Sequence, residues 1–356
     1  MIVALIAVVL TLLLVIGLHE AGHAIAAKLC GVKIQRISIG FGKPIVLWKG
    51  RQGCEWVWAM WPLGGYVNLL NTRIAPVEKQ YYSQCFDKQP LWIRLFILVS
   101  GGLANLLVAW LALTVYFMVG YIQEVPMVQG VEAHSIVATA GIRENDRIMD
   151  IAGNKTNSWQ EVGMGLITNL GKKIVAMTVE SPDHQMRELS LDMYQVPMKG
   201  KKSLFSAIGL DLKPKQLTHE TVAGLPFFEA ASKAIGKSFQ LLGFFLIMLK
   251  QVVTGAVSFA MLLGPASILA LSVASFTQGL SIFLYFIGSL SLAVGLVNLF
   301  PIPSLDGGSI LYAIAEKLRG KPLSVAMEIL LQRLAMIALS ILFLQLVMND
   351  IQRYLQ

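Results

Sequence analysis

Three residues near the start of the chain have the types and spacing needed for metal-dependent hydrolysis. His19, Glu20 and His23 form the sequence H-E-A-G-H. Histidines four residues apart lie on one face of a helix, about one turn apart, so both imidazoles can bind one metal ion. Glu20 lies beside them and could take a proton from a water activated at that ion. The pattern predicts a zinc-dependent hydrolytic site.

The surroundings of this motif are apolar. It ends a run without charged residues that extends from Met1 to Leu18. Ionisable side chains inside a membrane span are costly and usually have a function. The alternative is a chance H-E-x-x-H on a soluble helix, and the apolar run argues against it.

Asp306 is the candidate for a third ligand, which a catalytic zinc site needs in addition to an open position. It is the only acidic residue in the segment 230–315. Pro301 and Pro303 before it interrupt a helix, and Gly307-Gly308 after it allow a tight turn. Interrupted helices at membrane depth are tolerated where they line a protein-enclosed cavity. The alternative is an interfacial charge or a helix cap.

The composition indicates an integral membrane protein. Of the 356 residues, 55% are hydrophobic and 14% are charged, against about 25% charged in soluble domains. A span needs about 20 mostly apolar residues. We therefore expect a polytopic α-helical membrane protein with four transmembrane helices, in Met1–Ala27, Leu95–Val119, Ser281–Phe300 and Met327–Met348. A cleavable signal peptide does not fit the first run, because no basic residue precedes it.

The charge distribution predicts how the chain crosses the membrane. Residues 28–94 contain ten Lys and Arg against three Asp and Glu, whereas residues 121–226 contain eleven against twelve. Positive residues near span ends favour the cytoplasm. We expect 28–94 and the basic link 316–321 in the cytoplasm, and 121–226 and both chain ends across the membrane. The net charge of +8 is then a topology signal and does not indicate nucleic-acid binding.

Residues 33–70 predict a membrane-associated β-hairpin or small sheet. The segment 33–40 alternates polar and apolar residues, 55–61 is aromatic and β-prone, and Gly50 to Gly53 between them is a turn. Its tryptophans could lie at the membrane interface, namely Trp56, Trp58 and Trp61. The alternative is a small soluble sheet. A strand edge here could capture an extended substrate segment.

The segment 217–278 is expected to be membrane-associated. Within it, 227–250 is apolar with spaced charges, which is typical of an amphipathic helix on a membrane surface. The following stretch, 251–305, contains no charge and is too long for one span. Gly264-Pro265 should break it.

Residues 121–216 have the size of a separate small domain. Their segment 140–154 resembles the PDZ phrase A-G-L-x-x-G-D-x-I-x-x-I-x-G, with Asn145 where PDZ domains usually have Gly. Asn tolerates left-handed backbone better than most residues. A PDZ-like domain could bind a peptide C-terminus or an extended segment as an added strand. Alternatively, it could only restrict access sterically.

Together these motifs resemble the site-2 protease family of intramembrane zinc metalloproteases. The resemblance combines H-E-x-x-H in the first span with N-x-x-P-x-P-x-L-D-G-G, residues 298–308, in the third. Residues 100–105 resemble the family's small-residue motif ending in Asn, and residues 62–67 resemble its β-loop. The match extends over nearly the whole chain. It predicts a fold divided at 1–120, 121–216, 217–278 and 279–356, with the PDZ-like domain inserted between two halves of the membrane core.

The resemblance also implies roles for individual residues. One Zn²⁺ per chain would be bound by His19, His23 and Asp306, with Glu20 as general base. Asn105 would hold or polarise the scissile carbonyl. Substrate contacts are implied for Asn298 and for the β-loop residues Gly64, Gly65 and Tyr66.

The implied substrates are single-span membrane proteins within the lipid bilayer, such as an anti-sigma factor or remnant signal peptides. The implied location is a bacterial inner membrane, with the PDZ-like domain in the periplasm. Two features depart from the family: relatives commonly carry tandem PDZ domains, and Ala293 stands where relatives have a further Asn.

The residues are also compatible with two other functions. An intramembrane metal transporter could use His and Asp as a transit site, although Glu20 would add little to it and no inverted repeat is evident. A non-catalytic scaffold could bind membrane proteins through the PDZ-like domain. The intact set of His19, Glu20, His23 and Asp306 favours the protease.

Overall fold

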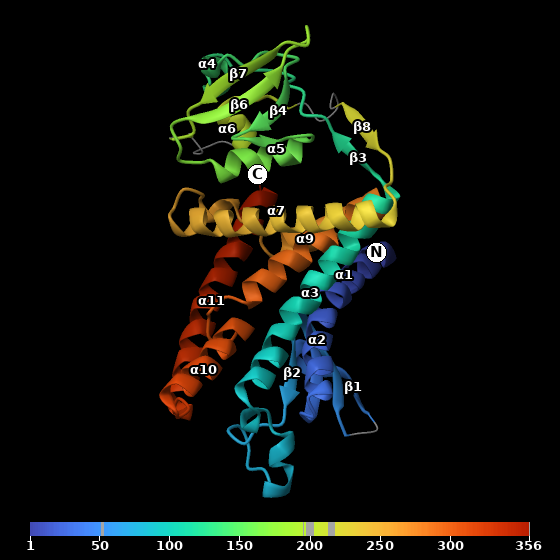
Figure 1. Ribbon diagram of the computed structural model, residues 1–356, viewed down its shortest axis with the longest axis vertical. Helices are drawn as coiled ribbons and strands as arrows, with labels where there is room; N and C mark the ends of the chain where they lie inside the picture. Colours follow the sequence, from blue (N-terminus) through green and yellow to red (C-terminus); the bar gives the residue numbers. More distant parts are fainter. Residues whose placement is uncertain (51–52, 195, 197–202, 213–217, 356) are drawn as a thin grey trace. The chain divides into compact units, whose positions relative to one another are not determined.

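The computed structural model describes residues 1–50, 53–194, 196, 203–212 and 218–355. The chain forms two compact units (Figure 1). The first comprises Met1–Tyr116, Phe227–Leu242 and Leu262–Gln356, and the second comprises Phe117–Pro226 and Gly243–Met261.

The first unit is built mainly from long helices. The first of them begins as α1 (Ile2–Leu12), passes through a π-helical turn η1 (Leu13–Gly17) and continues as α2 (Leu18–Leu29). The other helices that contribute to this unit are α3 (Leu91–Val119), α7 (Phe227–Val253), α8 (Pro265–Gln278), α9 (Leu280–Asn298), α10 (Asp306–Arg319) and α11 (Val325–Leu355). The start of α8 at Pro265 confirms the break predicted at Gly264-Pro265.

Among the described residues, five helices are long and apolar enough to cross a membrane. Four of them overlap the expected spans and differ from them by a few residues at the ends, namely Ile2–Leu29, α3, α9 and α11. The fifth is α7, for which the sequence predicts an amphipathic surface helix. The chain is thus a polytopic helical membrane protein with added β-structure. The count of four spans stays a prediction.

The predicted β-hairpin is present as two antiparallel strands, β1 (Ile34–Lys49) and β2 (Glu55–Leu69). Arg51 and Gln52 of the predicted turn lie outside the described residues. Ile37 lies opposite both Val67 and Trp56, so the first half of β1 runs between two segments of β2. The strands can curl in this way because glycines such as Gly64, with a φ of 91°, adopt left-handed backbone.

Small residues let the helices of the first unit approach closely. A Cβ added to Gly22 of α2 would lie 2.5 Å from the Ser100 carbonyl oxygen of α3. A Cβ added to Gly288 of α9 would lie 2.9 Å from Cγ of Leu113, also on α3. Helix α3 therefore packs tightly against both α2 and α9. This packing positions the residues described below.

An ion pair and a carboxylate cap link the later helices to the rest of this unit. Between β2 and α3, the chain forms the 3₁₀ turns η2 (Lys79–Gln84) and η3 (Phe86–Lys88). Arg94 pairs with Glu316 of α10 at 3.0 Å. Asp350 of α11 is buried and accepts hydrogen bonds from the backbone N–H groups of Gly264, Ala266 and Ser267. It caps the N-terminus of α8, where a negative charge is favourable.

The second unit contains a four-stranded antiparallel sheet in the order β5-β4-β6-β7. Its strands are β4 (Arg147–Ile151), β5 (Asn154–Lys155), β6 (Val175–Glu180) and β7 (Met186–Leu191). A separate pair joins β3 (Tyr121–Glu124) to β8 (His219–Val222). The helices are α4 (Ile136–Ala140), α5 (Trp159–Thr168) and α6 (Leu204–Ile208), and the 3₁₀ turn η5 covers Phe259–Met261.

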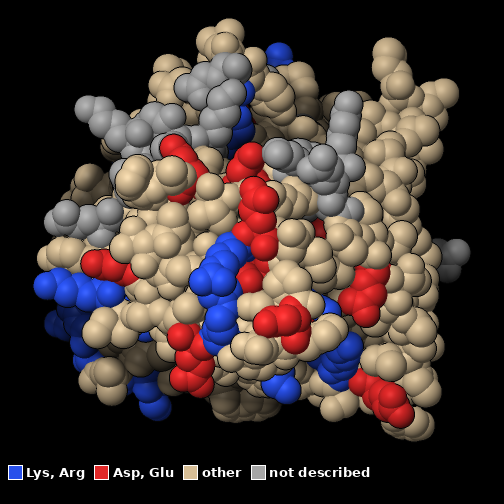
Figure 2. Space-filling model, turned by 90° about the horizontal axis from the view of Figure 1, so that it is seen from above, with Lys and Arg blue, Asp and Glu red and all other residues tan. Residues whose placement is uncertain are grey.

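The core of this sheet unit is formed by side chains that are fully buried, such as Ile148, Leu166 and Met177. Asn145 has a φ of 66°, which confirms the left-handed backbone expected at this position. Figure 2 shows acidic and basic side chains interspersed on one face of the molecule.

Candidate metal centre

The two histidines of H-E-A-G-H lie on one face of α2, as the spacing predicts. His19 is 5% exposed and His23 is 8% exposed. Their Nε2 atoms are 3.3 Å apart. Both imidazoles therefore present one nitrogen to the same point inside the protein.

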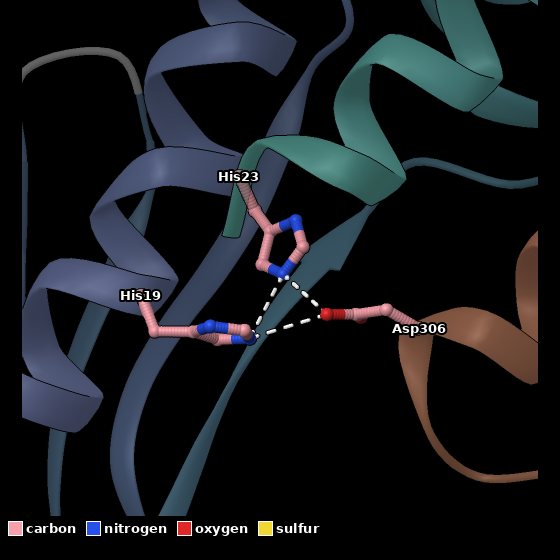
Figure 3. A group of neighbouring side chains, drawn as sticks. All are labelled: His19, His23 and Asp306. Carbon is pink, nitrogen blue, oxygen red and sulfur yellow. Dashed lines mark hydrogen bonds and ion pairs between the residues drawn. The ribbon is translucent and has the colours of Figure 1, made fainter. Parts of the chain in front are cut away.

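Asp306 completes the group from a distant part of the chain. Its Oδ2 lies 3.2 Å from Nε2 of His19 and 3.2 Å from Nε2 of His23 (Figure 3). Ligand atoms 2.0–2.2 Å from a tetrahedral Zn²⁺ lie about 3.3 Å or slightly more from one another. The separations of the three atoms thus fit a zinc ion with a fourth position open.

The segment between α9 and α10 brings Asp306 to the histidines. Helix α9 ends at Asn298, and α10 begins at Asp306 itself. The sequence predicts a tight turn at Gly307 and Gly308, but both lie in the first turn of α10. The two glycines instead let α10 pack closely against the segment that precedes it. A Cβ at Gly308 would lie 2.7 Å from the Ile302 carbonyl carbon. The interrupted helix itself is present as predicted.

The carboxyl group of Asp306 lies outside the candidate spans, and its environment keeps it ionised. Burial alone would raise its pKa, but hydrogen bonds to His19 and His23 and the charges of both lower it to about 2. An ionised carboxylate is the form that binds a metal.

A backbone carbonyl fixes the orientation of His23. Its Nδ1 donates to the carbonyl oxygen of Ile97 on α3 at 2.7 Å. A histidine that carries its proton on Nδ1 has a free lone pair on Nε2, the atom that faces Asp306. This contact preorganises His23 as a ligand.

Helix α3 can come this close because Gly101 has no side chain. A Cβ at Gly101 would lie 2.7 Å from Cε1 of His23 and 2.8 Å from Cε1 of His19. These distances are shorter than any real Cβ contact. Gly101 thus provides the space that both imidazoles occupy.

Glu20 and the hairpin meet beside the histidines. Glu20 is 7% exposed, and a Cβ at Gly65 of β2 would lie 2.9 Å from its Cγ. Gly64 has the left-handed backbone that bends β2 at this point. Tyr66 follows and forms a hydrogen bond with Arg36. The structure therefore places Gly65 against Glu20, whereas the side chain of Tyr66 has a partner within the hairpin.

Both asparagines singled out in the sequence lie next to His19. Nδ2 of Asn105 is 3.3 Å from its Nδ1, and Nδ2 of Asn298 is 3.3 Å from its Nε2. Asn105 is fully buried. The candidate residues from α2, α3, α9 and α10 are thus gathered around one imidazole.

Sequence reasoning missed two contributors to this site. Gly101 belongs to the small-residue run 100–105, and its spacing from Asn105 by one helical turn could have marked it. Ile97 contributes only a carbonyl oxygen. Because every residue has such an oxygen, no sequence signal could have found it.

His19 and His23 are buried on a helix long enough to cross a membrane, and the half-buried Asp306 joins them beside a glutamate. This arrangement defines a membrane metallohydrolase. The family model "Peptidase family M50" matches residues 7–342. The chain belongs to this peptidase family.

Similar proteins have related names. The regulator of sigma E protease of Haemophilus influenzae is 28% identical over 435 residues, which cover 97% of this chain and 98% of that protein. Protease RseP of Yersinia pestis is 27% identical over 444 residues, covering 98% of each chain. A protein of Xylella fastidiosa named as a zinc metalloprotease is 30% identical over 396 residues, covering 86% of this chain and 89% of that protein.

Proposed function

We propose that this protein is a zinc-dependent intramembrane endopeptidase of the bacterial inner membrane, with one Zn²⁺ per chain. The observation that carries the proposal is the meeting of three ligand atoms, from the buried His19 and His23 and the half-buried Asp306, 3.2–3.3 Å apart next to Glu20. Membership of family M50 and the names of the similar proteins support it.

In this proposal the chain's own residues supply the ligands and the base. A bound Zn²⁺ lowers the pKa of a water to about 7 and polarises a carbonyl group. Glu20 accepts a proton from the attacking water and later delivers it to the leaving amine. The burial of His19, Glu20 and His23 keeps bulk water away, which strengthens the electrostatic interactions at the site.

The hairpin is proposed to hold the substrate as an extended segment. A helical substrate hides its carbonyls in backbone hydrogen bonds, so it must unwind before cleavage. The strand β2 runs past Glu20 at Gly65, so a segment paired with the sheet near that point would lie beside the base. Asn298 is close enough to His19 to contact such a substrate.

Residues 121–216, which belong to the second unit, are proposed to be a single PDZ-like domain in the periplasm. Its support is the phrase over 140–154 and the left-handed Asn145. The alignment to the Haemophilus influenzae protease spans 435 residues, although this chain has 356. The difference is large enough for one small domain, as expected if relatives carry two PDZ domains.

The test is cleavage of a tagged single-span model substrate by the purified full chain in detergent, with zinc measured on the same sample. We expect one zinc per chain, loss of cleavage with a chelator and recovery on adding Zn²⁺. Asp306→Ala should lose both zinc and cleavage. Bound zinc without cleavage of any substrate would contradict the protease, and zinc flux into vesicles containing the protein would support transport instead.

A further inference from the structure

The side-chain oxygen of Asn105 is buried without a hydrogen-bond partner among the described residues. Asn105 is 0% exposed, and its Nδ2 lies 3.3 Å from Nδ1 of His19. A buried amide oxygen without a partner destabilises the folded protein. This arrangement requires an explanation, because buried polar groups are normally paired.

Zinc binding by His19 supplies the explanation. Nε2 of His19 faces Asp306, so His19 must bind a metal through Nε2 and carry its proton on Nδ1. In that tautomer the Nδ1–H group would point at the Nδ2 donor of Asn105, and two donors cannot form a hydrogen bond. A half-turn of the amide exchanges the two atoms and brings Oδ1 to the Nδ1–H group.

The half-turn satisfies the unpaired atom. Oδ1 has no partner where it lies, so the exchange gives up only the contact between Nδ2 and Nδ1 of His19, and a protonated Nδ1 cannot accept that hydrogen bond. A Cβ built on Gly295 of α9 would lie 3.1 Å from Cβ and 3.9 Å from Nδ2 of Asn105, so α9 packs closely against this side chain and holds it in place. The two ends of an amide have nearly equal size, so the space suits either orientation.

The other histidine follows the same design. Nδ1 of His23 donates to the carbonyl oxygen of Ile97, which is also on α3. With the Asn105 amide turned, each histidine would donate from Nδ1 to an oxygen of α3 and present Nε2 to the metal. Helix α3 would then orient both imidazoles although it supplies no ligand.

We propose that Asn105 is a positioning residue for His19: its Oδ1 accepts the hydrogen bond from Nδ1–H and thereby fixes the tautomer that binds zinc. This role differs from the contact with the scissile carbonyl that the family resemblance implies for Asn105. It rests on the proposed function only in taking zinc as the metal and His19 as a ligand.

The test is the zinc affinity of the full chain in detergent, measured by competition with a chromophoric chelator, for wild type, Asn105→Ala and Asn105→Asp. Loss of an outer partner typically weakens metal binding about 10–100-fold, and we expect this for Asn105→Ala. Asn105→Asp retains an acceptor oxygen and should bind zinc at least as tightly as wild type. Thr114→Val, which alters another buried polar side chain of α3, is the matched control and should bind as wild type does.

A donor to the scissile carbonyl would give a different pattern. Both Asn105→Ala and Asn105→Asp would then bind zinc as wild type does and lose cleavage, and this result would overturn the inference. Absorption of the Co²⁺-loaded proteins checks the coordination directly: we expect a changed spectrum for Asn105→Ala and a wild-type spectrum for Asn105→Asp. Absence of zinc binding in wild type would instead overturn the proposed function itself.

Discussion

Glu20 on α2 lies directly against Gly65 on β2. A Cβ added to Gly65 would lie 2.9 Å from Cγ of Glu20 and 2.8 Å from the carbonyl oxygen of Ser38. The hairpin thus passes the proposed general base without room for a side chain. The two elements are separated in sequence, yet they form one wall of the site.

This relationship predicts that Gly65→Ala impairs catalysis. The added methyl group must displace either Glu20 or β2, and a misplacement of about 1 Å can cost about 100-fold in rate. Zinc content should remain near one per chain, because the three atoms nearest to the added Cβ belong to Ser38 and Glu20 and not to a candidate ligand. Single-turnover cleavage and zinc quantification on one preparation test both points.

The matched control is Gly50→Ala, at the other end of the hairpin. Its Cβ would have no neighbour closer than 3.4 Å, so cleavage should be unchanged. If Gly65→Ala cleaves at the wild-type rate, the hairpin does not hold Glu20 in position.

Glu20→Gln separates metal binding from proton transfer. Glutamine has nearly the same shape as glutamate but cannot accept the proton, so cleavage should fall about 10²–10⁴-fold. Because Glu20 is not one of the three converging ligands, zinc should be retained. Glu229→Gln, an exposed change on α7, is the control. A Glu20→Gln variant with normal cleavage would exclude Glu20 as the base.

The candidate ligands and the candidate base could be predicted from sequence because their chemistry is local. The spacing of His19 and His23 determines that they share a helix face. Asp306 stood out because charge is absent around it and prolines precede it. The hairpin also followed from a local pattern, because a turn from Gly50 to Gly53 separates the alternating segment 33–40 from the aromatic segment 55–61. In each case neighbouring residues carry the information.

The features that could not be predicted from the sequence depend on how distant segments pack against one another. The space at Gly101 exists only because α3 crosses α2 at that point. The double pairing of Ile37 depends on both halves of β2 lying beside the same part of β1. The cap of α8 comes from Asp350, more than eighty residues later. Such relationships join distant segments and leave no periodic signal.

Asp87 provides a pH-dependent contribution to stability outside the membrane spans. Burial alone would raise the pKa of its carboxyl group, but hydrogen bonds from the side chain and backbone of Thr72 hold the pKa below its usual value of 3.8. A carboxyl group with a lowered pKa stabilises the fold above the pKa of the unfolded state, about 3.9, and loses that contribution as the pH falls through the folded value.

Asp87→Asn should therefore be less stable than wild type near pH 7, and the difference should shrink below about pH 4. Thermal unfolding of both proteins in detergent across this range measures the effect. Glu78→Gln alters an exposed acid of the same loop and should follow the wild-type profile. A difference between Asp87→Asn and wild type that does not change with pH would show that the loop is stabilised by something other than the ionised carboxylate.

Gly101→Ala tests whether α3 shapes the metal centre. The methyl group would fall within 2.7–2.8 Å of carbon atoms of His23 and His19, and neither imidazole can retreat without leaving its ligand position. Overpacking of this kind costs about 1–3 kcal/mol, which corresponds to about a 5- to 150-fold loss if it falls on zinc affinity. Gly236→Ala, at a helical glycine of α7 where no atom lies within 4 Å of the added Cβ, should leave zinc affinity unchanged. Chelator competition separates the outcomes: if Gly101→Ala binds zinc as tightly as wild type, α3 can move away from the histidines, and the close approach of α2 and α3 is not a requirement of the site.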